Sequence, residues 1–149
     1  MTIGIVYATM GGSTEQLASF IKEYLIEKGI RVELKEAFEN GAEDILRYEY
    51  IFLGSYTWGD GDVADEMLDI YDTLETMDLT GKLFGVFGSG DTCYEEFAGA
   101  VDMFEEMIQK QGGYLAVPGL KADIDLEEME IRKQVNLFTE AFLEAAKVK

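Results

Sequence analysis

The chain is organised around the stretch IGIVYATMGGSTEQL, which covers residues 3–17. Residues 3–8 form an apolar run that predicts a buried strand. The glycines and hydroxyl groups of residues 9–14 predict a tight turn, and the pattern that opens at Glu15 is typical of a helix start. The stretch therefore predicts a strand, a turn and a helix N-terminus in direct succession.

The turn at residues 9–14 offers a pocket for an anion, in particular a phosphate. Gly11 and Gly12 let the backbone coil tightly and approach a ligand closely. Thr9, Ser13 and Thr14 add hydroxyl groups beside the free amides of the first helical turn, which bind anions. An alternative stays open here, because a helix capped by Ser13 explains the same residues without a ligand.

The same turn lacks two common phosphate-binding motifs. A nucleoside triphosphate loop needs G-x-x-x-x-G-K-[ST], and no Lys or Arg occurs between Met1 and Phe20. A dinucleotide fingerprint needs G-x-G-x-x-G, and Gly4, Gly11 and Gly12 do not have that spacing. The turn therefore suits one terminal phosphate held by neutral donors, each of which contributes roughly 1.5 to 3 kcal/mol.

Composition narrows the classes of function. The 149 residues, 48% of them apolar, predict a single domain that spans residues 1–149. One cysteine and no histidine exclude an internal disulfide, histidine-based catalysis and the common zinc sites. No apolar run approaches the roughly 18 residues of a membrane span, and the N-terminus has no targeting pattern, so we expect a soluble cytoplasmic protein.

The charge balance is strongly acidic, with 30 Asp and Glu against 12 Lys and Arg and a formal net charge of −18. Such a surface repels nucleic acid and anionic membranes, so neither is expected as a partner. We expect partners that present basic patches, although solubility alone also explains an acidic excess.

Apolar runs and helical stripes alternate along the rest of the chain. Strands are expected at 3–8, 31–36, 50–56 and 83–89, and a fifth around Pro118 at 114–117 and 120–122. Helices are expected from the stripes within 17–25, 67–74, 97–108 and 131–142. Continuous apolar central strands that alternate with helices predict an α/β fold with a doubly wound parallel sheet, covered by helices on both faces.

Three loops should meet at one edge of this sheet. Residues 9–14, 57–62 and 90–97 each follow a predicted strand, and ligands bind beyond the carboxyl ends of parallel strands. The second loop contains Trp58 and the third Tyr94, so two aromatic planes flank the phosphate turn. This combination predicts a flat ring system with a phosphorylated tail, while either aromatic alone could be an anchor on the sheet edge.

These loops resemble those of a known family. YATMGGSTE at 7–15, TWGD at 57–60 and GSGDTCY at 88–94 look like the three flavin-binding loops of the flavodoxins. The resemblance covers essentially the whole chain. The length of the chain and its fifth-strand region, which has no inserted loop, are similar to those of the short-chain members. It implies a flavodoxin-like fold, with five parallel strands in the order 2-1-3-4-5 and FMN at the switch point between strands one and three.

The resemblance also implies roles for individual residues. Residues 9–14 would hold the phosphate of a non-covalently bound FMN, Thr57 would lie along its ribityl chain, and Trp58 and Tyr94 would cover the faces of its ring. The full set of implied cofactor-binding residues is Thr9, Met10, Gly11, Gly12, Ser13, Thr14, Tyr56, Thr57, Trp58, Gly59, Asp60, Ser89, Gly90, Asp91 and Tyr94. Neither a catalytic side chain nor a metal ligand is implied.

The phosphate turn departs from the family's usual T-x-T-G-x-T pattern. Gly11 stands where threonine is common and Ser13 where asparagine is common, which removes one side-chain donor.

The implied function is a low-potential one-electron carrier rather than an enzyme. A monomer would shuttle electrons between an NAD(P)H-dependent flavodoxin reductase and acceptor oxidoreductases that bind it transiently. Acidic residues in or beside the loops should lower the potential of the second reduction, which makes the flavin anionic. These residues are Asp60, Asp62, Asp65, Asp91, Glu95 and Glu96.

Three other functions fit the predicted architecture. A phosphoacceptor receiver domain needs acids after the first and third strands, where Ala8-Thr9 and Tyr56-Thr57 stand. An FMN-dependent NAD(P)H or quinone reductase needs a substrate pocket, for which this chain shows no spare segment. A flavodoxin-like protein dedicated to activating one metalloenzyme differs only in its partner and stays open.

Overall fold

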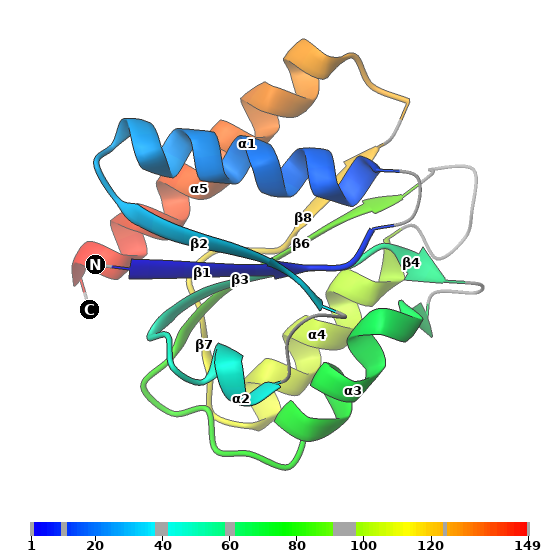
Figure 1. Cartoon of the computed structure of the whole chain (residues 1–149), viewed down its shortest axis with the longest axis vertical. Helices are drawn as coiled ribbons and strands as arrows, with labels where there is room; N and C mark the ends of the chain where they lie inside the picture. The colour runs from blue at the N-terminus through cyan, green and yellow to red at the C-terminus, as the bar shows by residue number, and fades with distance from the viewer. Residues whose placement is uncertain are drawn as a thin grey trace.

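The computed structural model describes residues 2–9, 12–37, 42–58, 62–90, 98–123 and 125–148, with only the backbone of 42, 43, 58, 62, 63 and 148. A sheet lies between two layers of helices (Figure 1). The strands are β1 (Thr2–Tyr7), β2 (Arg31–Glu36), β3 (Tyr50–Gly54), β4 (Thr57–Trp58), β5 (Asp62–Val63), β6 (Leu83–Gly90), β7 (Tyr114–Leu115) and β8 (Leu120–Asp123). The helices are α1 (Ser13–Glu27), α2 (Ala42–Ile45), α3 (Asp65–Leu74), α4 (Gly99–Lys110) and α5 (Glu128–Val148).

The main sheet has the predicted strand order. Its order is β2-β1-β3-β6-β7, with β8 also paired to β6, and every pairing in it is parallel. Because β4 and β5 form a separate small hairpin, this order corresponds to 2-1-3-4-5 in the predicted strands. The winding reverses between β1 and β3, where Tyr7 lies opposite Gly54.

The fifth strand is divided into β7 and β8, which correspond to the two segments predicted on either side of Pro118. Leu83 of β6 pairs with Tyr114 of β7, whereas Phe87 pairs with Leu120 of β8. From Tyr114 to Leu120 the fifth strand therefore advances by six residues, while β6 advances by four, from Leu83 to Phe87. The exposed Pro118 lies in this interruption, and its lack of an N–H makes it a residue that suits a break in a ladder.

Two hydrophobic clusters cover the two faces of the sheet. On one face Val6, Leu53 and Val86 pack with residues of α3 and α4, and on the other face Ile5 and Phe52 pack with residues of α1 and α5. Successive strand residues point to opposite faces, so each central strand is buried on both sides. Figure 1 shows α1 and α5 on one side of the sheet and α3 and α4 on the other.

Glycine follows the ends of two helices, and two small elements were not predicted. Gly29 after α1 has φ 78° and Gly112 after α4 has φ 85°, left-handed conformations that glycine adopts readily. The single-turn helix α2 and the hairpin of β4 and β5 are too short to produce a periodic pattern.

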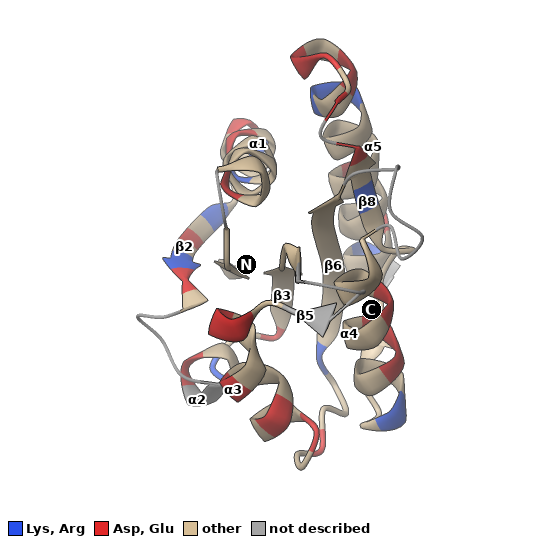
Figure 2. Cartoon of the chain, turned by 90° about the vertical axis from the view of Figure 1, so that its right-hand side faces the viewer, with Lys and Arg blue, Asp and Glu red and all other residues tan. Residues whose placement is uncertain are grey.

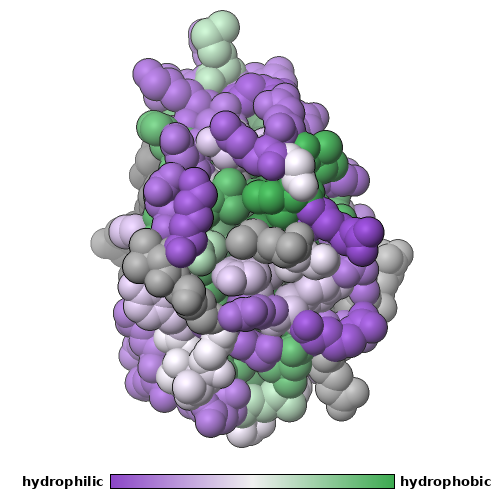
Figure 3. Space-filling model, turned by 90° about the vertical axis from the view of Figure 1, so that its left-hand side faces the viewer, coloured by the Kyte–Doolittle hydropathy of each residue, from purple (hydrophilic) through white to green (hydrophobic). Residues whose placement is uncertain are grey.

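The outer surface is predominantly polar. The face in Figure 3, on the side of the two termini, is largely hydrophilic and carries separate hydrophobic areas. In the part of the chain that the structure describes, no helix is both long and apolar enough to cross a membrane.

Candidate functional site

The carboxyl ends of β1, β3 and β6 bring the three predicted loops to one edge of the sheet. These strands are adjacent and parallel, so the residues that follow them leave the sheet on the same side. Backbone bonds continue past the strand ends, since Ala8 N–H donates to Gly54 O at 3.0 Å and Ser55 N–H donates to Phe87 O at 3.1 Å. The first residues beyond each strand are therefore held side by side.

The first turn presents an open helix N-terminus. Gly12 is the N-cap residue of α1, with φ 91° and no side-chain capping bond, so the alternative of a helix capped by Ser13 was wrong. Thr9 Oγ1 accepts a hydrogen bond from Glu15 N–H at 3.3 Å. Within the described segments, no acceptor bonds the amides of Ser13 and Thr14. Two amides without a partner among the described residues, at the positive end of a fifteen-residue helix, suit an anion.

The space around the turn also suits a bound group. A Cβ placed on Gly12 would have no heavy atom of the described residues within 4 Å, apart from its chain neighbours, so these residues leave space at this position. No Lys or Arg precedes Lys22, which leaves amides and hydroxyl groups as the donors on this segment. The donor set therefore fits the phosphate of FMN held without a counter-charge.

The first turn contacts the end of β6 through two buried hydroxyl groups. Thr14 Oγ1 lies 2.9 Å from Ser89 Oγ, and either atom can donate. Thr14 is fully buried and Ser89 is 7% exposed. The sequence positions of the two residues differ by 75, so this contact places the end of the first predicted loop beside the start of the third.

The second loop is closed at its base by side chains. Ser55 Oγ donates to Tyr56 O at 2.8 Å and accepts from Ala64 N–H at 3.3 Å. Tyr56 Oη donates to Glu66 Oε2 at 2.7 Å. Burial, and then the Glu66 carboxylate, raise the pKa of Tyr56 to about 12, so this phenol stays protonated and keeps donating.

Thr57 has a contact that the sequence did not predict. Its Oγ1 accepts a hydrogen bond from Ala100 N–H at 3.2 Å, in the first turn of α4. The N-cap residue of α4 is Ala98, whose φ of 49° is unusual for a residue other than glycine. Thr57 thus binds an orphan amide that the cap residue itself cannot bind.

The structure describes about half of the predicted site. Gly12, Ser13 and Thr14 lie with Ser89 and Gly90 at one edge, and Tyr56 and Thr57 follow the neighbouring strand. Met10, Gly11, Gly59, Asp60, Asp91 and Tyr94 lie outside the described residues, as do Glu95, Glu96 and the side chains of Trp58 and Asp62. Asp65 is exposed in the first turn of α3.

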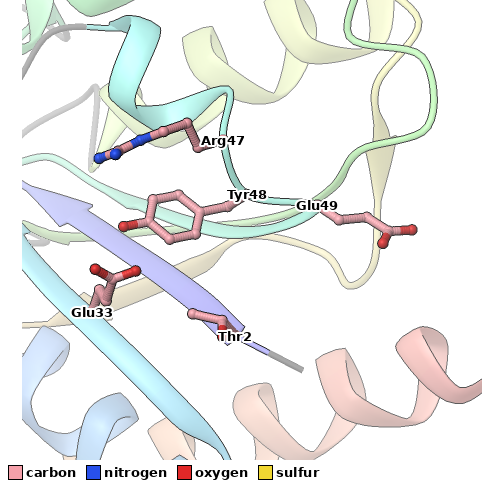
Figure 4. A pocket seen from close by; sticks show the side chains of 5 residues that line it. All are labelled: Thr2, Glu33, Arg47, Tyr48 and Glu49. Carbon is pink, nitrogen blue, oxygen red and sulfur yellow. The ribbon is translucent and has the colours of Figure 1, made fainter.

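A separate cavity lies at the opposite edge of the sheet and had not been predicted. It has a volume of about 260 Å³ and is lined by Thr2, Glu33, Arg47, Tyr48 and Glu49 (Figure 4). The Tyr48 hydroxyl is buried and has no hydrogen-bond partner among the described residues. Burial, and then the nearby Glu33, raise the pKa of Tyr48 to about 12.

Comparison with known proteins agrees with this geometry. The flavodoxin family profile matches residues 5–138. The chain is similar to probable flavodoxin 2 of Bacillus subtilis, with 42% identity over 89% of this chain and 88% of the relative. It is also similar to the crystal structure of oxidised flavodoxin 2 from Bacillus cereus, with 44% identity, a TM-score of 0.91, and 97% and 99% of the two chains covered.

A solved short-chain flavodoxin associated with a PDU bacterial microcompartment gives the same fold. It has 33% identity and a TM-score of 0.91, with 98% of this chain and 99% of that chain covered. A family match over most of the chain, relatives above 30% identity and the predicted strand order lead to one conclusion: the chain belongs to the flavodoxin family.

Proposed function

We propose that this chain carries single electrons at low potential on FMN bound at the carboxyl edge of β1, β3 and β6. As a flavodoxin it is an electron carrier and not an enzyme, which excludes the receiver and reductase alternatives. The observation that carries the proposed site is the N-terminus of α1, where the amides of Ser13 and Thr14 have no acceptor among the described residues and adjacent strands end.

The residues of the edge take distinct proposed roles. Residues 9–14 hold the phosphate, and the segment from Tyr56 to Asp60 and that from Ser89 to Tyr94 surround the rest of FMN. When bound, FMN supplies the one-electron chemistry. The protein holds the phosphate, covers the ring with Trp58 and Tyr94, and restricts access of water to it.

The phosphate role is tested by comparing two ligands that differ only in the phosphate. Apoprotein is titrated with FMN and with riboflavin, and FMN should bind far more tightly. Ser13→Ala should weaken FMN binding roughly tenfold and leave riboflavin binding unchanged, because one hydrogen bond to a charged group is lost. Ser19→Ala makes the same chemical change on the same helix and is the control. Equal affinity for both ligands, or no uptake of either, would refute the proposal.

Redox proteins are the partners of a flavodoxin, and their finer description is part of the proposal. We propose transient complexes with basic-faced proteins, an NAD(P)H-dependent flavodoxin reductase and acceptor oxidoreductases, and neither nucleic acid nor membrane. Acidic residues support this, since α1, α3 and α5 each carry Asp or Glu in the first turn. Figure 2 looks onto the carboxyl edge and shows these acidic segments around it.

The remaining proposals concern organisation and location. Residues 1–149 are proposed to form a single domain that acts as a monomer, because one sheet carries both hydrophobic clusters. The cytoplasm is the proposed location, and the sole cysteine is in keeping with a reducing compartment.

A further inference from the structure

The cavity at the amino ends of β1 and β3 is built around Tyr48. Tyr48 N–H donates to Ile45 O at 3.1 Å, and Tyr48 O accepts a hydrogen bond from Lys82 Nζ at 2.8 Å. The Tyr48 ring lies over Gly4 of β1, where a Cβ would come within 2.6 Å of Cδ2 of the ring. Described neighbours therefore fix both the backbone and the ring of Tyr48.

The ring directs the Tyr48 hydroxyl toward β2. Gly4 lies opposite Glu33 in the ladder of β1 and β2, so a ring that crosses β1 at Gly4 extends toward Glu33. Figure 4 shows the hydroxyl between the ends of the Glu33 and Arg47 side chains. Tyr48 is only 6% exposed, and its hydroxyl oxygen is buried without a hydrogen-bond partner among the described residues. A ligand that bonds this oxygen would satisfy a polar group that is costly to leave unpaired.

The charges that line the cavity favour a cation. Glu33 and Glu49 supply two carboxylates, whereas Arg47 supplies the one cationic side chain among the described lining residues. Arg47 also pairs with Asp44, at 3.4 Å, so much of its charge is balanced locally. The cavity wall is therefore negative, and a positively charged ligand gains Coulomb energy on entering it.

The chemistry of the wall suits an ammonium group better than a metal ion. No cluster of three acidic, histidine or cysteine side chains that could hold a metal occurs among the described residues. A primary ammonium has three N–H donors, and both a carboxylate and a phenol oxygen accept such bonds. The volume of about 260 Å³ has room for a short aliphatic chain, since one water takes up about 30 Å³ in the liquid.

We propose that this cavity binds small primary ammonium ions, with the Glu33 carboxylate and the Tyr48 hydroxyl oxygen as acceptors of the ammonium N–H groups. The side chains on either side of the hydroxyl, those of Glu33 and Arg47, are exposed, so a ligand that reaches the oxygen displaces surface side chains only. The inference goes beyond the proposed function and does not rest on it, because none of the lining residues belongs to the proposed FMN site.

The first arm of the test compares two cations of equal charge. The full chain, labelled with ¹⁵N, is titrated with n-butylammonium chloride up to about 50 mM at constant ionic strength, and NMR follows the backbone amides. The amides of residues 33 and 47–49 should shift and saturate. Tetramethylammonium has the same charge but no N–H donor, so it should give no saturable shift at these residues.

The second arm measures the affinity for n-butylammonium in three variants. Tyr48→Phe and Glu33→Gln should each weaken binding about tenfold, because each removes one charge-assisted hydrogen bond. Tyr48→Phe leaves the net charge unchanged and so isolates the hydroxyl. Glu106→Gln is the matched control for Glu33→Gln, since it removes the same charge from an exposed position on α4 and should leave the affinity unchanged.

Each alternative has its own result. Equal saturation by tetramethylammonium would overturn the proposal in favour of a general attraction to an acidic surface, and unchanged affinity in Tyr48→Phe would show that the hydroxyl bonds no ligand. Saturable shifts with magnesium chloride but not with n-butylammonium would identify a metal site instead. No saturable shift with either would refute a site altogether. All these results are independent of FMN uptake, so failure of the proposed function would leave this inference untouched.

Discussion

Gly54 illustrates how one residue at the end of β3 is fixed by its neighbour on β6. A Cβ at this position would lie 2.3 Å from Cζ of Phe87, the residue opposite it in the ladder, and Phe87 is fully buried. Gly54→Ala should therefore lower the free energy of unfolding by about 1 to 3 kcal/mol through overpacking. Urea unfolding of the apoprotein measures this change.

A second substitution identifies the cause of that loss. Phe87→Leu leaves space beside position 54, so Gly54→Ala should cost less in the Phe87→Leu background than in the parent. A cost that is the same in both backgrounds would show that backbone conformation, and not the Phe87 ring, excludes alanine.

Two buried tyrosines should make the fold sensitive to alkali. Tyr48 and Tyr56 have their pKa raised to about 12 in the folded state, against an ordinary value of 10.0. Between pH 10 and 12 the unfolded chain loses these protons and the folded chain keeps them. The free energy of unfolding should thus fall with rising pH, by about 1.4 kcal/mol per pH unit for each tyrosine, and be unaffected by these groups below pH 10.

Phenylalanine substitutions separate the two tyrosines. Tyr48→Phe should make the free energy of unfolding fall less steeply above pH 10. It should change the free energy of unfolding at pH 7 little, because the buried Tyr48 hydroxyl has no hydrogen-bond partner among the described residues. Tyr56→Phe should also make the fall above pH 10 less steep but should destabilise the protein at pH 7, because it loses the bond to Glu66. Urea unfolding at pH 7 and pH 11 checks both, and an unchanged slope in either variant would contradict the assignment.

At the scale of elements, the interruption of the fifth strand is held by α4. Gly119 N–H donates to Glu105 Oε2 at 2.9 Å, and a Cβ on Gly119 would lie 2.4 Å from Val101 Cγ1. Glu105→Ala should lower the free energy of unfolding by about 1 to 2 kcal/mol, because a backbone amide loses a charged acceptor.

The next residue along the helix is the control for this prediction. Glu106 pairs with Lys110 at 3.6 Å, and both side chains are more than 70% exposed. Glu106→Ala should therefore change the free energy of unfolding by less than about 0.5 kcal/mol. If both variants cost the same, the Glu105 bond does not hold the interruption. Thermal or urea unfolding of the apoprotein is the measurement.

Long elements were predictable and short ones were not. The continuous apolar run at 50–54 and the helical stripe of α3 each give a recognisable hydrophobic pattern over five or more residues. The hairpin of β4 and β5 has two residues in each strand, and its pairing depends on contacts that the pattern cannot contain. The two segments of the fifth strand were predicted, but their register on β6 was not, because Pro118 marks a break without fixing the register on either side.

The candidate site was predictable in place but not in detail. Parallel strands fix where Thr14 and Thr57 lie, so the meeting of their loops followed from topology alone. The hydrogen-bond partners of these two threonine hydroxyls could not be predicted, because Ser89 and Ala100 are 75 and 43 residues away along the chain. Ser13 could equally have been a cap by composition, and only the backbone of Gly12 decides between the two.

At the scale of the molecule, the net charge of −18 should control the rate of electron exchange. The reduced holoprotein should react with the cation hexaamminecobalt(III) more slowly as salt rises, by about tenfold between 10 and 500 mM, because screening removes attraction. Reaction with the anion ferricyanide should become faster over the same range. Stopped-flow absorbance measures both rates, and equal salt dependence for the two ions would contradict electrostatic steering.

The break between β7 and β8 is a suitable insertion site for additional residues. Ala116 N–H still donates to Phe84 O of β6, whereas Gly119 N–H donates to Glu105 of α4 instead of to the sheet. A peptide tag or a guest domain spliced between Val117 and Pro118 would break neither bond. It would leave the sheet at the edge formed by β7 and β8, between the pairs Phe84–Leu115 and Phe87–Leu120.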